Sequence, residues 1–157
     1  MMADNEPYPI VRPLVATDFH EWLSMWRGYN EFYGRVGETA LPQHITELTW
    51  ARLLDAGEPM GALVAELAGK LVGIAHFLFH RSTISVELTC YLQDLFTAPE
   101  ARGRGIATML IERSYDEAAA AGCRRIYWQT HKTNTVARQL YDRVAEQSGF
   151  IVYRKLL

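Results

Sequence analysis

The sequence predicts a single mixed α/β domain in which antiparallel strands are followed by β-α-β units. Two runs rich in β-forming residues flank Ala68-Gly69-Lys70, and a short connection with glycine is typical of a hairpin. A third apolar run, Cys90–Thr97, leads through a glycine-rich turn into helical periodicity from Ile106. Strand-like and helix-like patterns then alternate, which indicates a mixed sheet with helices on both sides.

Each element follows from local signals, and the length of 157 residues fits one domain, 1–157. Pro13 cannot donate to a ladder, so the first strand is an edge strand. Thr17 or Asp18 can cap the first helix, and Gly122 suits the end of the third. The expected order is β-α-α-β-β-β-α-β-α-β, with a loose tail at 1–8, strands at 10–14, 61–67, 71–79, 85–97, 124–130 and 150–156, and helices at 17–33, 42–54, 103–121 and 134–147.

Composition argues against several classes of protein. Sixteen basic and 18 acidic residues give a net charge of −2, which does not favour nucleic acid as a partner. No window approaches the roughly 20 apolar residues of a membrane span, so we expect no membrane partner. Cys90 and Cys123 lack metal-ligand spacing, and free buried thiols indicate a reducing cytoplasm. A nucleophilic role for Cys90 is less favoured, because no paired histidine is evident.

The turn Arg102-Gly103-Arg104-Gly105 has the chemistry of a phosphate site. Glycines allow close approach of the backbone, N–H groups at a helix start have no intrahelical acceptor, and arginines add charge. A Walker A loop is excluded because no lysine lies nearby, and a dinucleotide fingerprint fails because Thr108 stands where a third small residue is required. An ordinary strand-to-helix turn with two surface arginines is the alternative.

Four aromatic residues recur at helical spacing in the first helix, which places them on one face. Such a stripe is at least as often part of a core as of a site. It also suits the wall of an amine pocket, because aromatic faces attract cations. The predicted substrate-binding residues are Trp22, Trp26, Tyr29 and Tyr33.

A polar stripe formed by Asn134, Arg138 and Tyr141 follows from the spacing of the last helix. The neighbouring stripe of Val136, Leu140 and Val144 is apolar and can pack on the sheet. A polar stripe beside a core face can be a cofactor wall. On spacing alone, an ordinary amphipathic helix with a half-buried tyrosine is the simpler interpretation.

The motif R-x-x-G-x-A, formed by Arg102, Gly105 and Ala107, resembles the pyrophosphate-binding signature of the GCN5-related N-acetyltransferase (GNAT) superfamily. The preceding segment Tyr91–Phe96 is similar to the strand that carries this turn in the superfamily. The W-x-T and N-x-x-A-x-x-L-Y pattern of the superfamily also has a counterpart in this sequence. The overall pattern is nearest to the polyamine and Hpa2-like branch. The residues that match this second pattern are Trp128, Thr130, Asn134, Ala137, Leu140 and Tyr141.

The resemblance implies a central twisted mixed sheet of about 6–7 strands flanked by about four helices. It implies direct acetyl transfer from acetyl-CoA to a primary amine of a small molecule, with no metal and with a possible homodimer. Peptide or protein acetylation at lysine or the N-terminus is one alternative, and a non-catalytic acyl-CoA-binding module is another. The residues expected at the cofactor are Leu95, Phe96, Thr97, Arg102, Gly103, Arg104, Gly105, Ile106, Ala107, Thr108, Asn134, Arg138 and Tyr141.

The resemblance also implies catalytic roles. Tyr141 matches the tyrosine that donates a proton to the departing thiolate. Gln93 stands where the polyamine branch carries a glutamate base, and an amide cannot accept that proton. Asp94 and Glu87 are therefore equally ranked candidates for the base, with His131 as a further possibility, unless the amine arrives neutral.

Overall fold

One five-stranded sheet forms the centre of the computed structural model, which describes residues 6–157. Its strands lie in chain order, and each neighbouring pair is antiparallel except β4 and β5, which are parallel. The hairpin predicted at Ala68-Gly69 joins β2 to β3, and Ala68 and Gly69 both have positive φ. The strands are β1 (Ile10–Pro13), β2 (Met60–Leu67), β3 (Lys70–His80), β4 (Leu88–Thr97) and β5 (Cys123–Tyr127).

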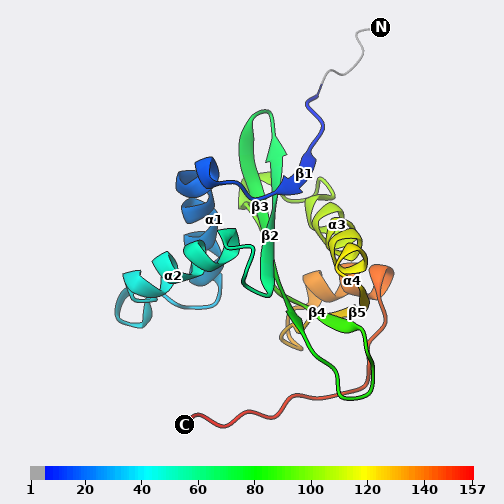
Figure 1. The fold of residues 1–157 in the computed structure, drawn as a ribbon. Coiled ribbons are helices and arrows are strands. Elements are labelled where there is room, and N and C mark those ends of the chain that lie inside the picture. Colours follow the sequence, from blue (N-terminus) through cyan, green and yellow to red (C-terminus); the bar gives the residue numbers. More distant parts are fainter. Residues whose placement is uncertain (1–5) are drawn as a thin grey trace, which may run out of the picture.

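Helices cover both faces of the sheet (Figure 1). Helices α1 and α2 lie on one side, and α3 and α4 lie on the other. No helix among residues 6–157 is long and apolar enough to cross a membrane. The helices are α1 (Phe19–Phe32), α2 (Gln43–Leu54), α3 (Ile106–Ala120) and α4 (Thr135–Val144), with single 3₁₀ turns at η1 (Ala16–Asp18), η2 (Gly37–Thr39) and η3 (Pro99–Ala101).

Two hydrophobic clusters hold these layers together. On the α3 side, Ile106, Leu110 and Ile111 are almost fully buried against the strands, and α4 adds partly buried residues. On the α1 side, Trp22 and Trp26 pack against β2 and β3. Because both faces of the sheet are covered, the central strands are apolar on both faces, which explains their near-continuous hydrophobic runs.

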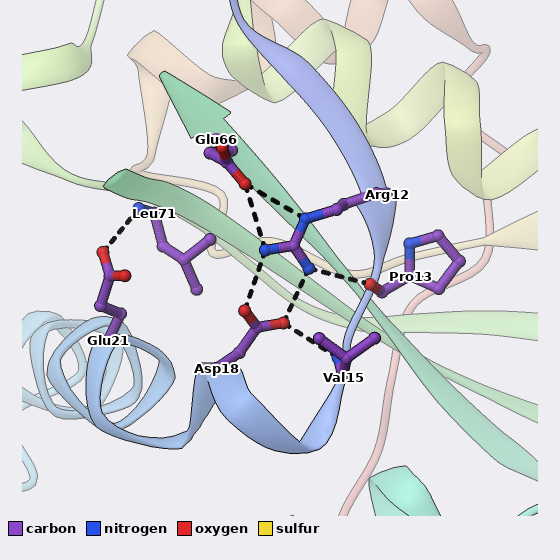
Figure 2. A network of polar contacts seen from close by, with 7 residues as sticks. All are labelled: Arg12, Pro13, Val15, Asp18, Glu21, Glu66 and Leu71. Atoms are coloured by element: carbon purple, nitrogen blue, oxygen red, sulfur yellow. Dashed lines mark hydrogen bonds and ion pairs between the residues drawn. The ribbon is translucent and has the colours of Figure 1, made fainter. Parts of the chain in front are cut away.

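A polar network fixes the start of the chain to the sheet (Figure 2). The guanidinium of Arg12 on β1 binds both carboxylate oxygens of Asp18, at 2.8 and 2.9 Å, and also binds Glu66 on β2. Asp18 accepts a further bond from the backbone N–H of Val15, and Glu21 accepts one from the N–H of Leu71 on β3. The network therefore joins β1, the start of α1 and the β2–β3 hairpin.

Two features of β4 prepare a site. Phe77 on β3 pairs with Leu92 and His76 pairs with Asp94, so Gln93 is an extra residue that forms a β-bulge. The pairing of β4 with β5 ends at Tyr91↔Tyr127, although β4 continues to Thr97. Because β5 itself ends at Tyr127, the edge of β4 beyond Tyr91 is not covered by β5.

One expected strand is wrong, and several expected element boundaries differ from those of the structure, including the start of β4 at Leu88 and the end of β5 at Tyr127. The expected strand at 150–156 is not formed, because no backbone of this segment pairs with the sheet and its side chains are exposed. The sheet consequently has five strands rather than six or seven. The last helix ends at Val144 instead of continuing to residue 147, and the Gly103–Gly105 segment is a turn that precedes α3. Most of the expected loose tail at 1–8 lies outside the described residues.

Candidate active site

A cavity of about 570 Å³ opens at the end of β4, beyond the last residue that pairs with β5. Four elements line it: the end of α1, the last residues of β4, the turn before α3 with the first turn of that helix, and one face of α4. All of the predicted cofactor residues line this cavity except Arg104 and Arg138.

The turn before α3 presents backbone donors to this cavity. Gly103 and Gly105 have φ values of 77° and 75°, in the left-handed region that glycine tolerates best. Gly105 is the N-cap of α3, so no side chain caps the helix, and the first N–H with an intrahelical acceptor belongs to Met109. The N–H groups of Ile106, Ala107 and Thr108 therefore remain available. A helix start of this kind binds anions such as phosphate.

The space in front of this turn is open. A Cβ placed on Gly103 or Gly105 would meet no atom within 4 Å. Thr97, at the end of β4, also lines the cavity, and its hydroxyl is buried without a hydrogen-bond partner in the described chain. The residues thus fit a ligand that carries phosphate groups and lies along the uncovered edge of β4.

The three predicted arginines have different positions. Arg102 lines the cavity, where its Nε donates to the carbonyl of Thr97 and its guanidinium lies 5.9 Å from the ring centre of Phe96. Arg104 is turned away from the cavity, with its Nη1 3.9 Å from the carboxylate of Glu6. Arg138 donates to the carbonyl of Lys132 and supports the loop before α4. Helical spacing alone could not predict that this long side chain turns back toward the loop.

Helix α4 brings Tyr141 and Asn134 to the cavity. The ring of Tyr141 packs edge-on against Trp128, and burial raises the pKa of Tyr141 to about 12. Its phenol is protonated at neutral pH and has a proton to donate there. The amide of Asn134 donates to Thr130. Val136, which was expected to pack on the sheet, lines the cavity and is mostly exposed.

The aromatic stripe of α1 is divided between core and cavity. Trp22 and Trp26 are buried in the core beneath α1, where the indole N–H of Trp26 donates to Thr46. Tyr29 and Tyr33, one and two turns further on, line the cavity. Both interpretations of the stripe therefore apply, each to one half of it.

A buried polar chain lies behind Tyr29. The indole N–H of Trp22 donates to His76 Nε2 at 3.0 Å, so the ring proton of His76 lies on Nδ1 and is donated to Asp94 Oδ2 at 2.9 Å. All three side chains are buried. Burial, followed by the charge of Asp94, raises the pKa of Tyr29. Tyr29 lines the cavity, whereas Asp94 does not.

The other predicted polar candidates lie elsewhere. Glu87 is exposed in the loop before β4 and is bonded to Ser85, at the opposite end of the strand from the cavity. Gln93 is the exposed residue of the β-bulge. His131 is exposed and bonded to Thr133. Burial raises the pKa of Cys90 to about 12, which makes this thiol unreactive.

Two residues at this site were missed by sequence reasoning. His76 lies on a strand, and its partners Trp22 and Asp94 are 54 and 18 residues away in the chain. Arg35 follows α1, and its guanidinium lies 5.6 and 5.4 Å from the ring centres of Tyr29 and Tyr33. The position of a basic residue directly after an aromatic stripe was the available signal for Arg35.

Comparison with known proteins defines the class to which this fold and site belong. The chain is an N-acetyltransferase, because relatives along most of its length carry that name. It belongs to the acetyltransferase (GNAT) family, whose sequence profile matches residues 20–145.

Two relatives illustrate the similarity. The D-amino-acid N-acetyltransferase HPA3 of Saccharomyces cerevisiae is 30% identical over 148 residues, covering 93% of this chain and 89% of that protein. The solved structure of the aminoglycoside N-acetyltransferase AAC(6')-Iy in complex with CoA superposes with a TM-score of 0.80 at 19% identity, covering 98% and 99% of the two chains. The second similarity concerns the fold alone.

Proposed function

We propose that this N-acetyltransferase moves an acetyl group from acetyl-CoA to the primary amine of a small molecule, by direct attack in a ternary complex. The observation that carries the proposal is the cavity, in which an uncapped helix start and a protonated tyrosine face the same space. Acetyl-CoA supplies a thioester carbonyl open to attack by an amine and a thiol as the leaving group.

The residues of the turn would hold the donor. The N–H groups at the start of α3 suit its pyrophosphate, and Arg102 adds a positive charge beside them. Backbone groups of Leu95–Thr97 on the uncovered edge of β4 can bond the pantetheine amides and polarise the carbonyl. Asn134 would complete the wall from α4.

Asp94 would accept the proton that the ammonium group must lose. An amine with an ordinary pKa of about 10 is protonated at neutral pH and cannot attack until it has lost a proton. The bond from His76 occupies Asp94 Oδ2, and the proton would reach the carboxylate by way of Tyr29, which lines the cavity and is affected by the charge of Asp94. Asp94 would thus replace the acceptor that Gln93 cannot provide, and it is favoured over Glu87 because Glu87 lies in the loop before β4, at the opposite end of the strand from the cavity.

Tyr141 would donate its phenolic proton to the departing sulfur. The protons balance as follows: Asp94 takes one proton from the ammonium before attack, the C–N bond then forms and the C–S bond breaks, and Tyr141 Oη protonates the departing thiolate. The second proton of the attacking nitrogen is released as the amide forms and restores the phenol of Tyr141, and the proton on Asp94 leaves to solvent. The position of Tyr141 on the cavity wall supports this role, and its phenol is protonated over the working range of pH.

The acceptor we propose first is the amine of an amino acid. The yeast relative is named for D-amino acids. The guanidinium of Arg35 beside Tyr29 and Tyr33 could bind a substrate carboxylate at the mouth of the cavity. An amine that also carries a carboxylate would engage both ends of this arrangement.

Thiol release from acetyl-CoA tests the proposal across D- and L-amino acids, polyamines, aminoglycosides and lysine peptides. We expect release stimulated by small amines, and a loss of kcat of about 10²–10⁴-fold in Tyr141→Phe. The matched control is Tyr115→Phe, a tyrosine that bonds the carbonyl of Val144 and does not line the cavity. If only peptides stimulated thiol release, the substrates would be proteins and not small molecules. Full activity of Tyr141→Phe would refute the role of Tyr141 as the acid.

A further inference from the structure

Gly28 stands in the interior of α1. A glycine in such a position destabilises a helix by about 1 kcal/mol relative to alanine, so its presence there needs another reason. A Cβ added to Gly28 would lie 2.7 and 2.9 Å from Cζ and Cε1 of Phe96 on β4, whereas carbon atoms in contact lie about 3.5–4.0 Å apart. Gly28 therefore gives the tip of the Phe96 ring a place that a larger residue would fill.

The ring of Phe96 lies between the core and the cavity. It is 8% exposed and belongs to the buried cluster on the α1 side, together with Trp26, Tyr29 and Ile74. It also lines the cavity at the end of β4. Because protein interiors are close-packed, the core side has no room for a displaced ring. A ring pushed away from α1 would therefore move toward the cavity.

Arg102 also lines the cavity, and two contacts hold its side chain there. Its Nε donates to the carbonyl of Thr97 at 3.3 Å, and its guanidinium carbon lies 5.9 Å from the centre of the Phe96 ring, within the range of a cation–π contact. No carboxylate among residues 6–157 pairs with this guanidinium. Its charge is therefore free for an anion, and its position depends on that of the ring.

We propose that Gly28 is a positioning residue of the donor site, which acts through Phe96 on Arg102. The missing side chain of Gly28 lets the Phe96 ring lie against α1, and the ring and the Thr97 carbonyl then hold the guanidinium beside the phosphate groups of the donor. Gly28 itself does not line the cavity. The inference rests on the proposed use of acetyl-CoA as the donor.

Two glycines provide a matched test. A Cβ on Gly61 of β2 would lie 2.8 and 2.9 Å from Cε2 and Cζ of Phe77, whose ring does not line this cavity. Gly28→Ala and Gly61→Ala thus crowd a phenylalanine ring to the same extent. In calorimetric titration with acetyl-CoA, Gly28→Ala should raise Kd at least about tenfold, the order expected for the loss of a charge-assisted hydrogen bond. Gly61→Ala should leave Kd within about twofold, although it lowers the melting temperature.

A double variant shows whether the effect depends on Arg102. In Arg102→Gln, which lacks the cation, Gly28→Ala should change Kd by less than about twofold, because the displaced ring has no guanidinium to move. Phe96→Leu removes the ring without adding an atom to α1, so it should weaken binding even if Gly28→Ala does not fold.

Several results would overturn the proposal. A tenfold loss from Gly28→Ala that persists in Arg102→Gln would mean that the ring merely obstructs the cavity. An equal loss in Gly61→Ala would mean that crowding of the core is responsible. Unchanged Kd in Gly28→Ala or in Phe96→Leu refutes this inference alone, whereas a wild type that does not bind acetyl-CoA refutes the proposed function as well.

Discussion

Among single residues, His76 is the most informative, because a histidine buried this deeply needs hydrogen-bond partners for both ring nitrogens. It has them in Trp22 and Asp94, so the ring is fixed in one tautomer and one orientation. The consequence is a carboxylate held in place by a neutral donor and not by a full positive charge. This fixed position near the cavity-lining Tyr29 is why we assign the base to Asp94.

Replacing each carboxylate by its amide tests whether Asp94 or Glu87 is the base. Asp94→Asn keeps the shape of the side chain and removes the proton acceptor, so we expect kcat to fall about 10²–10⁴-fold. Glu87→Gln is the control, since Glu87 is exposed in the loop before β4 and should leave kcat within about twofold. Steady-state kinetics with the best amine, together with the melting temperature of each variant, measures the effect. If kcat fell in Glu87→Gln and not in Asp94→Asn, Glu87 and not Asp94 would be the base.

The sequence alone indicated the residues whose roles depend on local geometry. The turn at Gly103–Gly105 and the position of Tyr141 on α4 follow from spacing within one element. The hydrogen-bonded pair of His76 and Asp94 could not be predicted from spacing, because the bulge at Gln93 shifts the register between two strands. The direction of the Arg138 side chain could not be predicted from spacing either, since a long side chain can turn toward either end of its helix.

At the scale of elements, the junction of β1 and α1 depends on the Arg12 network (Figure 2). The hydrogen bonds from Arg12 hold the pKa of Asp18 below its ordinary value of 3.8, against the opposing effect of burial. A carboxylate with a lowered folded-state pKa stabilises the fold above the pKa of the unfolded chain. That contribution is lost as the pH falls through the folded-state value.

We therefore predict that Asp18→Asn lowers the free energy of unfolding by about 1–3 kcal/mol at pH 7. The range is below that of a fully buried pair, because Arg12 is partly exposed and solvent screens it. Urea unfolding at pH 7 and at pH 3 measures the effect, with the exposed Asp116→Asn as control. The difference between wild type and Asp18→Asn should shrink at pH 3. An equal difference at both values of pH would show that the charge of Asp18 is not responsible.

Most elements were predictable because their signals are local. The hairpin, the strand before the turn and all four helices follow from periodicity, glycine and proline. The C-terminal segment was not, although its composition is typical of a strand. A strand needs a neighbour with which to pair, and the single chain does not place one beside Phe150.

For the whole molecule, the fact that β4 extends beyond the end of β5 determines where the cavity lies. It exposes one edge of β4, and α3 and α4 bring a helix start and a tyrosine to the same opening. The mixed α/β class and the helices on both faces were predicted correctly from the order of elements. The number of strands was too high, and the cavity itself could not be predicted because it is formed by four elements distant in the chain.

The central claim is that the turn before α3 binds the donor, and calorimetric titration with acetyl-CoA tests it most directly. Gly105 and Gly122 have φ values of 75° and 77°, so Gly105→Asp and Gly122→Asp strain the backbone alike at opposite ends of α3. Gly105→Asp also places a negative charge beside the phosphate site, and we predict at least about 100-fold weaker binding. Gly122→Asp should lower the melting temperature without weakening binding. Unchanged affinity in Gly105→Asp would contradict the account.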